Sequence, residues 1–284
     1  MASDTVLATE IRGLDTLETH VDGVSLGSRL WHGIAPKVVA VAIVLGLWEG
    51  VVLLGLKPEY VLPSPAQALS EFARQLGLST FWHAVAVTVT RGVAGFTIAS
   101  VIGLALGILV SRSRFLRSAI GSLITGLQTM PSIAWFPLAI LLFQLSEMAI
   151  LFVILIGAVP SIANGVISGV DYVPPTLVRA GRNLGASGLA MYRHVVLPAA
   201  LPSVVSGLKQ GWAFAWRSLL AGELIVAIAN RPSLGAYLSN SRELGDPAYM
   251  IAIMIAILLI GVLVDTVFTV VDTAIRRGRG VLVG

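Results

Sequence analysis

The sequence predicts an all-α, polytopic membrane protein whose helices pack as a bundle, and two observations lead to this fold class. Of the 284 residues, 56% are hydrophobic and only 12% are charged, and the mean hydropathy is +0.89. A water-soluble core of this size cannot hold so much apolar surface. The apolar residues also fall in runs of helical-span length, which favours helices over the alternating segments of about ten residues found in outer-membrane barrels.

Six apolar runs are long enough to cross a hydrocarbon core of about 30 Å, and they predict six transmembrane helices. The runs cover residues 38–56, 87–111, 119–143, 148–169, 201–229 and 248–273.

The basic residues predict the orientation of these helices. If the N-terminus is cytoplasmic, twelve of the 19 Lys and Arg residues lie on cytoplasmic segments: Arg12, Arg29, Lys37, Arg112, Arg114, Arg117, Arg179, Arg182, Arg193, Arg276, Arg277 and Arg279. Cytoplasmic loops are enriched in basic residues, so both termini are expected in the cytoplasm. The same distribution explains the net charge of +4 without nucleic-acid binding.

The spans divide the chain into four parts. Residues 1–36 contain five acidic residues and no basic stretch followed by an apolar one, so they are read as a cytoplasmic tail and not as a signal or transit peptide. Residues 37–84 hold the first span and an extracellular helix, and residues 85–275 form the transmembrane core, including a cytoplasmic segment at 171–199. Residues 276–284 form a basic cytoplasmic tail.

The extracellular helix is predicted from the stretch LPSPAQALSEFARQL. Ser64 is placed to cap it, Pro65 occupies its first position, and Gln67 completes a capping box. One face is apolar and consists of Ala66, Leu69, Phe72, Ala73 and Leu76. Such a helix lies on the membrane surface or packs against the bundle, and the sequence leaves both options open.

Several function classes lack their sequence signatures. None of the three lysines, Lys37, Lys57 and Lys209, follows a glycine, so there is no P-loop and ATP hydrolysis would belong to a partner. The chain shows no selectivity-filter loop and no catalytic motif of the common hydrolases. Cysteine is absent and the four histidines are far apart in the sequence, so no metal site is expected.

The segment between the fourth and fifth spans is polar and rich in glycine. Pro174 and Pro175 interrupt the chain, and Thr176 is expected to cap a helix that begins near Leu177. Two short helices joined by a bend at 185–188 are the simplest outcome. Small residues at Ala180, Gly181, Gly185 and Ala186 would let another protein approach the backbone, with Arg182, Arg193 and His194 as donors at the edge.

This segment resembles the signature of binding-protein-dependent ABC permeases, in which Glu-Ala-Ala, three residues and Gly are followed after about nine residues by Ile-x-Leu-Pro. Here the pattern reads Arg179-Ala180-Gly181, then Gly185-Ala186, then Val195-x-Leu197-Pro198. Arginine replaces the acid at 179, and glycine replaces alanine at 181. Further stretches resemble the nitrate, sulfonate and taurine branch of these permeases: Trp48-Glu49, Leu62–Pro65, Thr88–Arg114, Met130–Phe143, Ala221–Leu224 and Ser233–Leu238.

The resemblance implies a type I ABC importer permease in a bacterial inner membrane, importing a small anionic or organosulfur solute. It implies a homodimer of this chain, two ATPase subunits that carry ATP and Mg, and an extracytoplasmic solute-binding protein; the chain itself would be no enzyme and bind no cofactor. The 171–199 segment would be the coupling helix that transmits closure of the ATPase dimer. The residues expected to contact the ATPase are Arg179, Ala180, Gly181, Arg182, Leu184, Gly185, Ala186, Tyr192, Leu197 and Pro198.

The ionisable residues of the fifth span suggest a translocation path. Lys209, Trp212, Trp216 and Glu223 are spaced to share one broad face of the helix, with Arg217 beside them. Charged residues within a span usually face the bundle interior or water, so this face is a candidate path for an anion. The alternative is structural: Arg217 would pair with Glu223 or Asp265, and Lys209 would extend to the cytoplasmic surface.

The sequence supports two smaller expectations and leaves two rival functions open. Glu49 and Glu147 are expected to be solvated or interfacial, and Gly103 and Gly107 to permit close helix packing. One rival is a permease of the same architecture for a pyrimidine of the thiamine-precursor type. The other is a stand-alone secondary transporter or channel, although no convincing inverted repeat is seen.

Overall fold

The computed structural model describes residues 26–226, 228 and 231–277, which contain helices and no strands. The chain divides into two compact units, residues 1–58 and 59–284. The first unit contains α2 (Leu26–Leu53), of which Ala35–Leu53 is long and apolar enough to cross a membrane. The predicted tail at 1–36 is therefore helical from Leu26 onward, and residues 1–25 lie outside the described part.

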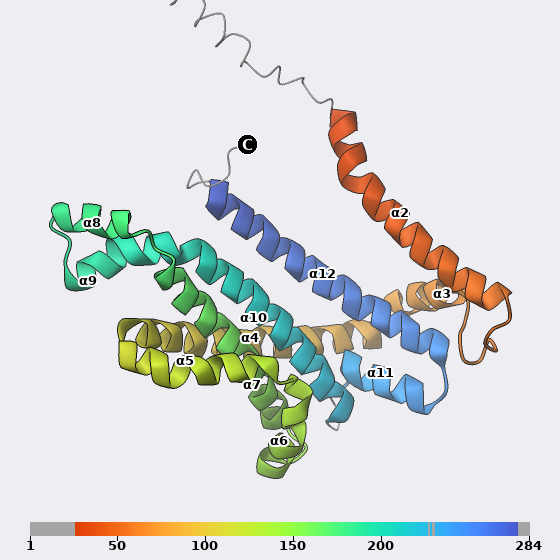
Figure 1. Ribbon diagram of the computed structural model, residues 1–284. Helices are drawn as coiled ribbons and strands as arrows, with labels where there is room; N and C mark the ends of the chain where they lie inside the picture. Colours follow the sequence, from red (N-terminus) through yellow and green to blue (C-terminus); the bar gives the residue numbers. More distant parts are fainter. Residues whose placement is uncertain (1–25, 227, 229–230, 278–284) are drawn as a thin grey trace, which may run out of the picture. The chain divides into compact units, whose positions relative to one another are not determined.

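The second unit holds all the other helices. In chain order they are α3 (Pro65–Leu76), α4 (Ser79–Arg112), α5 (Arg114–Thr129), the 3-10 turn η1 (Ser132–Trp135), α6 (Phe136–Phe143), α7 (Glu147–Asp171), α8 (Pro175–Asn183), α9 (Gly188–Met191), the π-helical turn η2 (Tyr192–Val196), α10 (Leu197–Ile225), α11 (Leu234–Glu243) and α12 (Pro247–Arg277). The long helices α4, α7, α10 and α12 pack against one another, with α8 and α9 at one end of this unit and α11 at the other (Figure 1). These are called below the α8–α9 end and the α11 end.

Five of the six predicted spans are found as single helices, but the third is wrong as a continuous span. The run at 119–143 is split into α5 and η1–α6, which meet at an angle of 102°. Met130 and Pro131 at the break have extended ψ angles of 132° and 128°. Proline lacks the backbone donor and disfavours helical geometry in the preceding residue, so the helix ends there. The described residues thus hold five membrane-length helices, or six if the bent pair counts as one span.

The predicted start of α3 is confirmed. The Gln67 backbone N–H donates to Ser64 Oγ (3.3 Å), and the Ser64 N–H donates to Gln67 Oε1 (2.8 Å). Further along, Arg74 Nε donates to Glu71 Oε2 at 2.8 Å and this hydrogen bond lowers the pKa of Glu71. The pair therefore contributes at neutral pH, and its contribution is lost as the pH falls through the lowered pKa.

The sequence left open whether α3 lies on the membrane surface or packs against the bundle, and in the structure it packs against the bundle. The helix, which the sequence reading grouped with the first span, packs against α12 within the second unit. The side it buries only partly overlaps the apolar face predicted above: the buried residues are Pro65, Ala68 and Gln75, and Phe72 of the predicted face is partly buried against a core cluster that includes Ile253 of α12. Leu69 and Leu76 of the predicted face remain exposed, as expected for a helix that also contacts lipid.

Glycines set the spacing of the central helices. A Cβ at Gly103 would lie 2.8 Å from Ile162 Cβ, and one at Gly107 would lie 2.6 Å from Val166 Cβ, so the expected close packing of these glycines is confirmed, against α7. The closest approach to a neighbouring backbone atom is between α7 and α10, where a Cβ on Gly165 would lie 2.5 Å from Gly207 Cα. Only glycine permits backbones to meet at this distance.

Replacing Gly165 with alanine is therefore expected to push α7 and α10 apart and to destabilise the purified chain by about 1–3 kcal/mol, as overpacking does in close-packed cores. Thermal unfolding in detergent, followed by tryptophan fluorescence, measures the change. Gly121→Ala in α5 is the matched control, because a Cβ there meets nothing within 4 Å. Equal melting temperatures for the two variants would contradict the packing account.

Candidate functional site

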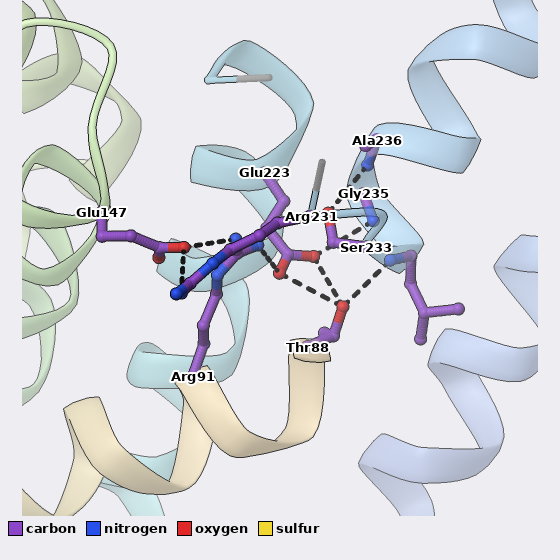
Figure 2. Close-up of polar contacts among 9 residues, drawn as sticks. Thr88, Arg91, Glu147, Glu223, Arg231, Ser233, Gly235 and Ala236 are labelled. Atoms are coloured by element: carbon purple, nitrogen blue, oxygen red, sulfur yellow. Dashed lines mark hydrogen bonds and ion pairs between the residues drawn. The ribbon is translucent and has the colours of Figure 1, made fainter. Parts of the chain in front are cut away.

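Two arginines and two glutamates form a charged cluster at the α11 end (Figure 2). Arg91 comes from α4, Glu147 from the first turn of α7, Glu223 from α10, and Arg231 from the connection between α10 and α11. Arg91 lies between the two acids, with Nη1 2.9 Å from Glu223 Oε1 and Nη2 2.6 Å from Glu147 Oε1. Arg231 Nη1 lies 3.2 Å from the same Glu147 oxygen. The cluster therefore ties together three long helices and a connecting loop.

Glu223 is the most deeply buried member, with 0% of its side chain exposed. Besides Arg91, its carboxylate accepts hydrogen bonds from Thr88 Oγ1 (2.9 Å) and from the backbone N–H of Gly235 (3.1 Å). Thr88 Oγ1 in turn accepts the N–H of Leu234 (2.9 Å). Because Leu234 and Gly235 open α11, the carboxylate also interacts favourably with the positive end of that helix. A buried charge with so many partners is stable where it lies.

Because residue 235 is a glycine, the first turn of α11 can pack directly against α10 at Glu223. A Cβ at position 235 would overlap Glu223 Cβ and come within 3.2 Å of Glu223 Cα. The start of α11 therefore lies directly on the backbone of α10. Ala221–Leu224 and Ser233–Leu238, two of the stretches that resemble the permease branch, meet at this point.

The residues proposed to line a path on α10 do not form one exposed face. Trp212 and Trp216 are buried and stacked, with ring centroids 5.9 Å apart, and Glu223 lies in the cluster. Lys209 Nζ lies 3.1 Å from Asp265 Oδ1 and donates to Thr269 Oγ1 at 2.9 Å.

The suggested pairing of Arg217 is wrong in the described residues, where no ion pair joins it to Glu223 or Asp265. Arg217 Nε donates to the Ala213 carbonyl (2.9 Å), and its guanidinium lies 4.8 Å from the ring centroid of Phe214. Arg217 and Asp265 both border a cavity of about 550 Å³ between α10, α11 and α12. A role of these α10 side chains in translocation stays a prediction.

The bend predicted in the 171–199 segment is found between α8 and α9. Gly185 (φ +83°) and Gly188 (φ +50°) have left-handed backbone conformations that suit glycine. The predicted cap is wrong, because α8 begins at Pro175 with Pro174 before it and no side-chain cap at its start. Proline is favoured at the first helical position, where its missing N–H is not needed.

The segment leaves apolar side chains uncovered. Leu184 at the bend is 89% exposed, and Leu177 and Leu189 are exposed as well. Gly181 is the exception among the predicted contact residues, because it is buried by Met191 and Val195 of the same segment. The rest are exposed (Arg179, Ala180, Arg182, Leu184, Gly185 and Leu197) or partly exposed (Ala186, Tyr192 and Pro198).

The segment is joined to the bundle at several points. From α9 onward the chain is helical without interruption to the end of α10, covering Gly188–Ile225. Leu197 N–H donates to the Tyr192 carbonyl five residues back, and Pro198, which lacks an N–H, favours such a π-turn. The Arg112 guanidinium lies 5.3 Å from the ring centroid of Tyr192, and Arg117 forms an ion pair with Asp171.

Sequence reasoning identified Glu223 but missed its partners Thr88, Arg91 and Gly235. Arg91 carried a usable signal, because an arginine within an apolar helix needs an acid nearby. Among the residues that the structure describes, no group of three histidines and acids is arranged to hold a metal ion.

Comparison with known proteins agrees with this architecture. Residues 99–277 match the family described as binding-protein-dependent transport system inner membrane component. The chain is 29% identical to the nitrate import permease protein NrtB of Synechocystis over 245 residues, covering 81% of this chain and 86% of that protein. It is 29% identical to the taurine transport system permease protein TauC of Escherichia coli over 234 residues, covering 79% and 85%.

A solved structure shares the fold. The inward-facing MetNI methionine ABC transporter aligns with a TM-score of 0.56 and 22% identity, covering 68% of this chain and 93% of the matched one. The fold is thus that of a type I ABC importer permease. With well over half of the sequence matched, the chain belongs to the family of binding-protein-dependent transport system inner membrane components.

Proposed function

We propose that this chain is the membrane subunit of an ATP-driven importer that translocates a small anionic or organosulfur solute of the aliphatic sulfonate, taurine or nitrate type. The observation that carries the ATP-driven part is the exposed leucine at the bend between α8 and α9, on a segment helically continuous with α10. Exposed apolar side chains next to basic ones are typical of a protein-binding surface. The names of the nitrate and taurine relatives support the solute class.

The proposed assembly contains two copies of this chain, two ATPase subunits and an extracytoplasmic solute-binding protein. ATP and Mg bind to the ATPase subunits, which carry out hydrolysis, so the chain itself has no enzymatic role. The α8–α9 end, with Arg112, Arg117 and Arg193 near it, faces the cytoplasm by the positive-inside rule. The α11 end then faces the solute-binding protein, and both termini are cytoplasmic.

In this proposal α10 carries the conformational signal. Closure of the ATPase dimer moves the α8–α9 segment, and α10 transmits the movement because it is continuous with that segment. The other end of α10 carries Glu223, so the movement strains the ion pairs and hydrogen bonds that this residue forms in the charged cluster. ATP drives the cycle because it binds the closed ATPase dimer more tightly than the open one.

The test is reconstitution of the purified chain with its ATPase and solute-binding protein into proteoliposomes. Uptake of radiolabelled taurine or nitrate is expected to require ATP on the side of the ATPase and to require the binding protein. Uptake driven by an ion gradient with the chain alone would support a secondary transporter or channel and contradict the proposal. ATP-driven uptake of a pyrimidine but of neither anion would retain the importer and change its solute.

A further inference from the structure

A cavity of about 380 Å³ lies against the charged cluster at the α11 end. Among the described residues it is lined by one face of α4 and by the connection to α11: His83, Ala86, Val87, Thr90, Arg91 and Arg231. This volume is at the lower end of the range for small-molecule sites, about 300–1,000 Å³. The cavity can therefore hold a small solute.

The ionisable groups on its wall are two arginines and a histidine. Neither Glu147 nor Glu223 lines this cavity, although both pair with Arg91. The carboxylates thus hold Arg91 in place but do not contribute oxygens to the described lining. The two arginines and the two glutamates sum to zero charge, so the wall favours anions over cations through the hydrogen-bond donors that it presents and not through net positive charge.

The wall also has unused hydrogen-bond donors. Arg91 keeps 11% of its side chain exposed, and each of its Nη atoms uses one hydrogen for a carboxylate, Nη1 for Glu223 and Nη2 for Glu147, so each has a second hydrogen to donate. Arg231 is 63% exposed, and its described ion pair and hydrogen bond both use Nη1 only. Thr90 and His83 are exposed and can each donate a hydrogen bond. Guanidinium groups match the oxygens of planar and tetrahedral oxyanions better than they match halides or neutral groups.

The position of the cavity along α4 is also informative. This helix has 34 residues and is about 50 Å long, or about 20 Å longer than a hydrocarbon core. Arg91 lies about 18 Å from its first residue, close to the edge of the core if Arg112 lies at the opposite interface. A ligand in the cavity would therefore be at the outer membrane interface.

We propose that this cavity is an oxyanion site that takes one sulfonate, nitrate or phosphate group, with Arg91, Arg231, Thr90 and His83 as donors. Ala86 and Val87 contact the short carbon chain of an aliphatic sulfonate. The inference rests on the proposed function, because it makes the cavity the first site in the membrane for an anion released by the solute-binding protein. A lipid phosphate headgroup at this depth is also an oxyanion, and it is the second possible occupant of the cavity.

The test is calorimetric titration of the purified full chain in nanodiscs with sodium methanesulfonate and with sodium nitrate. One set of nanodiscs contains only phosphatidylcholine, whose phosphate is neutralised by its own choline, and a second adds phosphatidylglycerol, whose phosphate carries a net negative charge. Thr90→Val and Arg231→Gln are each expected to weaken anion binding about tenfold, the effect of losing one hydrogen bond to a charged group. Arg242→Gln is the matched control, since Arg242 is exposed on α11 and does not line the cavity.

Absence of saturable binding to the unmodified chain, or wild-type affinity in Thr90→Val, overturns the site. Equal affinity in both lipid compositions supports the soluble anion as occupant. Binding that is lost when phosphatidylglycerol is present supports the oxyanion site with a lipid phosphate in it. The importer is judged separately: ATP-driven uptake that persists without anion binding overturns the site alone, and anion binding without ATP-driven uptake overturns the importer alone.

Discussion

Replacing Arg91 with methionine is expected to destabilise the chain by about 3–5 kcal/mol, because it leaves the buried carboxylate of Glu223 without its cationic partner. Methionine fills a similar volume, so the effect is mainly the loss of charge. Most of this free energy is the penalty for an unpaired buried charge and not the net strength of the pair. The measurement is thermal unfolding of the detergent-solubilised chain, together with its abundance in membranes.

A double variant separates the charge effect from lost packing. Adding Glu223→Gln to Arg91→Met removes the unpaired charge and leaves an amide oxygen to accept from Thr88 and Gly235. We expect the second change to recover at least 1 kcal/mol, a coupling energy typical of residues in direct contact. Arg74→Met, at the exposed pair with Glu71, is expected to have an effect below about 1 kcal/mol. Simple additivity of the two cluster substitutions would show that Arg91 and Glu223 do not act as a pair.

The spans were predictable because bilayer crossing depends on length and hydropathy, which are properties of a local stretch of sequence. The break at Met130–Pro131 was not predicted, because the residues on both sides of it are apolar. Mean hydropathy over 119–143 is the same whether the helix axis continues straight or bends, so it does not reveal the break. Proline does occur inside spans, and Pro160 lies within the continuous helix α7. A proline alone therefore does not decide between a helix that continues and one that turns by 102°.

The charged cluster shows a different limit. Helical spacing relates residues on one helix, and it placed Glu223 on a face with Lys209, Trp212 and Trp216. The partner of Glu223 is on α4, 132 residues away in the sequence, and the spacing along α10 carries no information about it. The sequence did indicate that an acid within a span needs a partner, but it selected Arg217 because that residue is near in sequence. Packing of α4 against α10 decides the pairing.

Replacing Leu184 with aspartate is expected to separate the chain from its ATPase without unfolding it. Leu184 is 89% exposed, so the substitution removes almost no packing within the chain and the melting temperature should be unchanged. At an interface, a buried apolar side chain near the centre contributes 2 kcal/mol or more, and a buried aspartate adds a desolvation penalty. Co-purification with the ATPase should fall by about thirtyfold or more, and solute uptake in proteoliposomes should fall with it.

Three controls decide what such a loss means. Leu244→Asp makes the same change at an 80% exposed leucine of the α11 end, where no ATPase contact is proposed, and should leave assembly intact. Gly185→Trp adds bulk where a Cβ meets nothing within 4 Å, and it also places a tryptophan in a left-handed conformation (φ +83°), so it should uncouple ATP hydrolysis from transport by blocking the proposed docking surface and by straining the bend. Arg179→Glu, which introduces the acid of the family pattern, should be tolerated. If Leu184→Asp assembles normally while Arg179→Glu does not, the exposed leucine is not part of the docking surface and the basic residues of α8 provide it instead.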